Sequence, residues 1–117
     1  MTGAGRIAVA RVTRHAPDCE LCQRQNAALS PSAVEGTHDS LTDLPAAYVE
    51  IIHRVTNDPT RLSKSWFEGV IASGLAETVY VEIVAVVGIV HSVDVFCRRL
   101  DISAPALPAP DAVGLGV

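Results

Sequence analysis

Cys19 and Cys22, two cysteines separated by two residues, have the clearest potential for chemistry in this sequence. Pro17 disfavours helical geometry just before them, and Asp18 is a favourable N-cap for a helix that begins at the first cysteine. Unpaired backbone N–H groups and the helix dipole at such a start favour a thiolate. The spacing also lets one sulfur attack a sulfenic acid or mixed disulfide formed on the other. The pair therefore predicts dithiol–disulfide chemistry.

Zinc binding is a second chemistry that the cysteine pair could serve. Zinc needs two further ligands, and the candidate side chains are Cys97, His15, His38, His53 and His91. No two of them have the short spacing of a typical ligand pair, so the sequence assigns no metal and no cofactor. A thioredoxin-like domain would place the motif after a strand, whereas the flanking residues favour helix. Cysteines that merely pack within a helix are a third interpretation.

His15 is the candidate proton acceptor for the two thiols. It lies four residues before the first cysteine, so the break at the following proline can fold it back over the helix start. The alternative is an exposed loop histidine. His91 is expected to be a core or interface residue with one hydrogen bond. His38, in a turn, and His53, on a helix, are expected to be solvated.

Helix-forming residues and the spacing of apolar side chains predict four helical segments in the first two thirds of the chain. They cover residues 7–12, 19–29, 46–56 and 62–71. A short helix restart is expected after Ser30, and a polar turn over residues 36–43. On the third of these segments, Glu50 and Arg54 are expected to form an ion pair on the outer face.

The segment from Glu77 to Leu100 is the most apolar of the chain. Its β-branched residues favour a strand by propensity. The apolar run does not alternate, however, and it continues at helical spacing without a turn signal, which favours one long helix. Glu82 within it is expected either on the outer edge or in a polar contact across a subunit boundary. The predicted fold is all-α, with about five helices, the cysteine motif at a helix N-terminus and a long C-terminal helix.

Composition limits the classes of partner. The chain has 117 residues, 49% of them hydrophobic and 19% charged, which argues against disorder. We expect a single domain over residues 1–103, shortened at its N-terminus, and a proline-rich tail over residues 104–117. The net charge of -4 and the scattered basic residues argue against nucleic acid as a partner. The most hydrophobic stretch, over residues 79–90, is too short and too interrupted by charge for a membrane span. Three cysteines, an odd number, favour a cytoplasmic location.

Two parts of the sequence resemble a known family. The run from Arg6 to Val12 precedes Cys19 and Cys22, and the run from Asn26 to Leu29 follows them. Later, residues 75–84 lead into residues 93–102 and a proline-rich exit. These segments resemble the alkylhydroperoxidase D-like group of the carboxymuconolactone decarboxylase-like superfamily, over residues 6–108. The resemblance implies an all-α fold, homo-oligomers that are trimers or larger, and thiol-dependent reduction of small-molecule peroxides.

The resemblance also implies separate roles for the two cysteines. In the family's peroxidases the second cysteine attacks the peroxide and the first resolves the product, which makes Cys22 peroxidatic and Cys19 resolving. A thiol reductant protein then reduces the disulfide. The family's relay glutamate and histidine are replaced here by Ile7 and Asn26, which cannot transfer a proton. That replacement favours an alternative function, a non-catalytic or non-redox oligomeric protein or small-ligand binder, whereas the intact cysteine motif favours the peroxidase.

Overall fold

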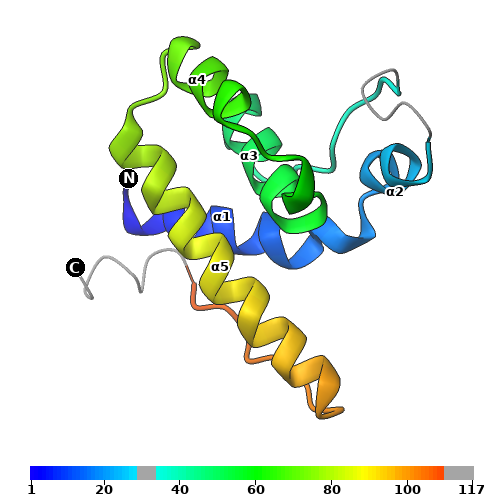
Figure 1. Cartoon of the computed structure of the whole chain (residues 1–117). Coiled ribbons are helices and arrows are strands. Elements are labelled where there is room, and N and C mark those ends of the chain that lie inside the picture. Colours follow the sequence, from blue (N-terminus) through cyan, green and yellow to red (C-terminus); the bar gives the residue numbers. More distant parts are fainter. Residues whose placement is uncertain (29–33, 110–117) are drawn as a thin grey trace.

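All regular structure in the described part of the chain is helical. The computed structural model describes residues 1–28 and 34–109. Two short 3-10 helices, η1 (Ala16–Asp18) and η3 (Pro59–Arg61), lie between the longer elements. The five α-helices are α1 (Gly3–His15), α2 (Glu20–Ala27), α3 (Ala46–Asn57), α4 (Lys64–Ala72) and α5 (Glu77–Arg99) (Figure 1). The predicted all-α class, with a long C-terminal helix, is confirmed.

The hydrophobic core lies where α1, α3 and α5 pack against one another (Figure 1). Each helix contributes apolar side chains that recur every three or four residues, so one face of each is turned inward. The buried residues of this core are Val9, Val12, Val49, Ile51, Ile52, Ile83 and Val87. Helix α4 packs on the core through Trp66 and Val70, and the ring of its Phe67 meets that of Tyr80 edge-on at a centroid distance of 4.9 Å.

Helix α5 forms although its residues favour a strand. The buried side chains Ile83, Val87 and Val90 follow one another at intervals of four and three residues. A helix places all three on one face, whereas a strand would turn alternate residues to opposite sides. Packing of that face on α1 and α3 therefore outweighs the β-propensity of the individual residues.

The opposite face of α5 is apolar and exposed. Val81 is 64% exposed, Ile89 67% and Phe96 61%, and the C-terminal half of the helix extends beyond the other helices (Figure 1). By length and composition the 23-residue helix could cross a membrane. One such helix is weak support for a span, because core helices and signal sequences meet the same criteria.

Two arginines of α1 bind carboxylates of α5. Arg6 Nε lies 2.5 Å from Glu82 Oε1, and Arg14 Nη2 lies 2.9 Å from Asp94 Oδ1. Arg14 Nη1 also donates a hydrogen bond of 2.7 Å to the carbonyl of Pro105, which holds the first part of the proline-rich tail. Glu82 is therefore half-buried and paired within its own chain, which explains how a carboxylate is accommodated in so apolar a helix.

The start of α2 differs by one residue from the prediction. Asp18 ends η1, and Cys19 takes the N-cap position without a side-chain capping bond. The first cysteine thus precedes the helix and the second lies in its first turn. Part of the helix restart predicted after Ser30 falls on residues 29–33, outside the described residues, and Val34 and Glu35 beyond them are not helical. Residues 34–45 instead form an irregular loop between α2 and α3.

Candidate functional site

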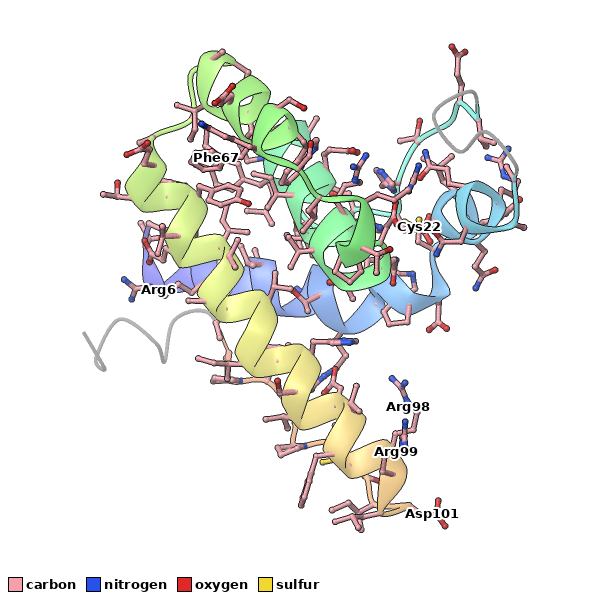
Figure 2. All side chains as sticks on the ribbon, viewed as in Figure 1. Arg6, Cys22, Phe67, Arg98, Arg99 and Asp101 are labelled. Carbon is pink, nitrogen blue, oxygen red and sulfur yellow. The ribbon has the colours of Figure 1, made fainter. Side chains whose placement is uncertain are left out.

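The junction of η1, α2 and α3 positions the cysteine pair. Asn57, at the end of α3, donates a hydrogen bond of 2.7 Å to the carbonyl of Ala16 in η1. The carbonyl of Asn57 accepts a second bond, of 3.2 Å, from Nδ2 of Asn26 in α2. These two bonds hold η1 and the last turn of α2 against the C-terminal end of α3. Figure 2 shows Cys22 on the side of α2 that faces α3.

Both cysteines are buried and reduced, and their sulfurs lie against two imidazole rings. Cys19 is 0% exposed and Cys22 6%. The Cys22 Sγ atom lies 3.3 Å from Nδ1 of His38 and 3.3 Å from Nδ1 of His53. The Cys19 Sγ atom lies 3.7 Å from the same Nδ1 of His38. Two sulfurs and two nitrogens thus converge, and all four atoms lie within 4.8 Å of one another.

The outer nitrogen of each imidazole has its own partner, which fixes the orientation of the ring. Nε2 of His38 lies 2.8 Å from a carboxylate oxygen of Glu50. Nε2 of His53 lies 2.9 Å from the carbonyl oxygen of Asp39. Because a carbonyl or carboxylate can only accept, we assign the proton to Nε2 in both rings. In neutral imidazoles, both Nδ1 lone pairs then point at the sulfurs.

The surroundings shift the pKa values of the two histidines in opposite directions. Hydrogen bonds with Cys22 and Glu50 raise the pKa of His38 to about 10. Burial, together with the nearby charge of His38, lowers the pKa of His53 to about 4. At neutral pH the site therefore holds one charged and one neutral imidazole. Burial raises the pKa of Cys19, but hydrogen bonds with the backbone of Asp39 and Cys22 and with the side chains of His38 and Cys22 together outweigh it, so this pKa lies below its usual value.

The structure brings both predicted cysteines into this cluster but places His15 outside it. His15 Nε2 lies 3.2 Å from a carboxylate oxygen of Asp39, and its side chain is 37% exposed. The two histidines that were expected to be solvated are in the site instead: His53 is fully buried, and the His38 side chain is 10% exposed. The predicted pairing of Glu50 with an arginine of its own helix is replaced by its bond to His38.

A sequence signal for His53 did exist. Val49, Ile52, His53 and Thr56 recur at the spacing of one helix face, and all four are buried in α3. His38 has no comparable signal, since it lies in the irregular loop and only the path of that loop brings it to the cysteines.

A pocket opens beside His38, and neither cysteine is among the residues that line it. Its volume is about 520 Å³, and Leu44, Ala47 and Val49 contribute apolar surface to it. The polar groups in its wall include His38 and Glu50. A small molecule with an apolar body and one polar end could therefore enter beside His38.

The cluster can support two kinds of chemistry. Two neighbouring thiols beside imidazoles can be oxidised to a disulfide and reduced again, and two sulfurs with two imidazole nitrogens can bind a metal ion. No family model, curated protein or solved structure matches this chain. Its function must therefore be inferred from the chemistry of the site itself.

Proposed function

We propose that this protein is a thiol-dependent oxidoreductase that reduces small-molecule peroxides, with Cys22 as the attacking thiol and Cys19 as the resolving thiol. The observation that carries the proposal is the position of the Cys22 sulfur, 3.3 Å from Nδ1 of each of two imidazoles. A protonated imidazole such as that of His38 stabilises a thiolate at this distance, and the thiolate is the nucleophilic form of cysteine. An odd number of cysteines, with two of them in one C-x-x-C pair, supports the cytoplasm as the location.

The proposed cycle has three steps. The Cys22 thiolate attacks the distal peroxide oxygen, the O–O bond breaks, and the sulfur becomes a sulfenic acid while the alkoxide leaves. The alkoxide takes a proton and departs as an alcohol. The Cys19 thiol then attacks the oxidised sulfur, which forms the disulfide and releases water. An external dithiol supplies two electrons and two protons to restore both thiols.

His38 and Glu50 supply the proton transfer that Ile7 and Asn26 cannot. Ile7 is 7% exposed on α1, and the Asn26 amide is engaged with the end of α3, so both have structural roles here. Nδ1 of His38, by contrast, faces both sulfurs, and its Nε2 is held by Glu50. His38 can therefore donate a proton to the departing alkoxide, with Glu50 stabilising the charged ring. His38 and Glu50 would thus provide the proton relay in place of residues at positions 7 and 26.

The pocket beside His38 supports an organic peroxide as the substrate. Its apolar residues would contact the body of the molecule, while the peroxide group would lie toward His38 and the sulfur behind it. The same pocket also supports the alternative function, a small-ligand binder in which the two buried cysteines have no redox role. Peroxide turnover distinguishes the two functions.

We expect the reduced, metal-free protein to consume an organic hydroperoxide in the presence of excess dithiol and a chelator. His38→Asn is expected to lower kcat/KM for the peroxide by about 100-fold or more, because removal of a general acid typically costs that much. His91→Asn, the same change on α5, is the control and should leave the rate unchanged. A rate for wild type that does not exceed that of free dithiol would instead favour the ligand binder. Loss of turnover in His15→Asn with full turnover in His38→Asn would assign the relay to His15.

The exposed stripe of α5 supports homo-oligomer formation. Val81, Ile89 and Phe96 belong to a run of exposed apolar side chains along one straight helix, so two copies of the stripe can pack on each other. We expect light scattering at micromolar concentration to give a multiple of the chain mass. Ile89→Asp should shift the mass toward the monomer, whereas Ala72→Asp, on α4, should not. A monomeric wild-type protein would contradict the oligomer.

A further inference from the structure

We infer that Cys19, Cys22, His38 and His53 form a tetrahedral site that binds one Zn²⁺ ion in the reduced protein. Two thiolates and two imidazoles are a standard donor set for structural zinc. The same soft donors disfavour magnesium and calcium, which prefer oxygen ligands. The inference depends only on the placement of these four side chains, and it does not require the proposed peroxide chemistry.

Three of the six distances between the donor atoms already lie close to those of a zinc tetrahedron. Zinc–sulfur and zinc–nitrogen bonds of about 2.3 and 2.0–2.1 Å at tetrahedral angles place sulfur and nitrogen about 3.6 Å apart. The Cys22 sulfur lies 3.3 Å from each imidazole Nδ1, and the Cys19 sulfur lies 3.7 Å from Nδ1 of His38. All four donor atoms lie within 4.8 Å of one another. To complete the coordination, the other three pairs of donor atoms would have to close from at most 4.8 Å to the roughly 3.3–3.8 Å of a zinc tetrahedron.

The partners of the two imidazoles are those that zinc-binding histidines require. A ligating histidine almost always donates its other N–H to a carboxylate or a backbone carbonyl. Glu50 provides the carboxylate for His38, and Asp39 provides the carbonyl for His53. Both rings are thereby turned so that Nδ1 faces the sulfurs. This feature is independent of the donor distances and supports the same conclusion.

Zinc would connect three separate segments of the chain. The cysteines lie at the start of α2, His38 in the loop over residues 34–45, and His53 in α3. Metal bound to residues so far apart in sequence stabilises the folded state, since the unfolded chain does not hold the ligands together. Zinc-bound thiolates are also unavailable for attack on a peroxide, so zinc should inhibit the proposed reaction.

The test is metal titration of the reduced, metal-free full-length chain, with Co²⁺ as a spectroscopic probe and Zn²⁺ in competition with a chromophoric chelator. We expect one ion per chain, a thiolate-to-cobalt charge-transfer band, and the intense visible bands of tetrahedral cobalt. Glu50→Gln, at a side chain that is 45% exposed, should weaken zinc binding by about 10- to 100-fold. Cys19→Ser should weaken it further, since it removes a ligand.

Cys97→Ser and His91→Asn are the matched controls, because they alter a cysteine and a histidine of α5. Both should bind zinc as wild type does, and circular dichroism should show all variants to be helical. The inference is overturned if reduced wild-type protein gives no thiolate–cobalt band, or if Cys97→Ser weakens binding as much as Cys19→Ser. Peroxide turnover, measured with chelator present, is a separate readout. Failure of the redox function therefore leaves the zinc result interpretable, and the reverse also holds.

Discussion

Replacing Cys22 by serine is expected to abolish peroxide turnover, so that peroxide is consumed only at the rate of the free dithiol. A serine hydroxyl beside the same imidazoles is a far weaker nucleophile than a thiolate and cannot form the sulfenic acid. Cys19→Ser should behave differently. It should reduce one equivalent of peroxide in a single turnover and then stop or slow, since the Cys22 sulfenic acid has no neighbouring thiol to resolve it. Peroxide consumption at single and multiple turnover separates the two variants.

Cys97→Ser is the control for this experiment. Cys97 is as buried as Cys22, at 6% exposure each, but it lies near the end of α5 and is not part of the cluster. The Cys97→Ser variant should retain full peroxide turnover. The proposed roles would be reversed if Cys19→Ser lost the first turnover while Cys22→Ser retained it. The lowered pKa of Cys19 makes this comparison informative, since a thiolate at Cys19 is the competing nucleophile.

The fold was predictable because its signals are local. In the segment of α5, the interval of three and four residues between Ile83, Val87 and Val90 indicates a helix whatever the propensity of each residue. Prolines and turn residues mark the ends of α3 and α4 in a similar way. The bonds of Arg6 and Arg14 to α5 were not predictable, because they join residues more than seventy positions apart.

The site was predictable only in its cysteine half. Cys19 and Cys22 are three positions apart, so a motif describes them, and a helix start places them together. His38 and His53 come to the sulfurs through tertiary structure, from positions 16 and 31 residues beyond Cys22. A search for metal ligands that lie close together in the sequence does not find these two histidines. The spacing of buried residues on the face of α3 that carries His53 could, however, be recognised from the sequence. The missing information is the path of the loop between α2 and α3.

Helix α3 connects the site to the core, so a core substitution in it should have a large effect on stability. Ile52 is 0% exposed and packs between α1 and α5, next to His53 in the sequence. We expect Ile52→Ala to lower the free energy of unfolding by about 3 kcal/mol, from the lost burial and the cavity left behind. Chemical denaturation, followed by circular dichroism, measures this change.

Ile89→Ala is the matched control, because it makes the same change at a side chain that is 67% exposed. For a monomer this variant should differ from wild type by less than about 0.5 kcal/mol. In an oligomer that buries the α5 stripe, the loss of stability in Ile89→Ala should grow as the protein concentration rises above the dissociation constant, while that in Ile52→Ala should not. An effect of Ile52→Ala below about 1 kcal/mol would contradict the packing of α3 between α1 and α5. It would thereby also undermine the geometry that holds His53 against the Cys22 sulfur.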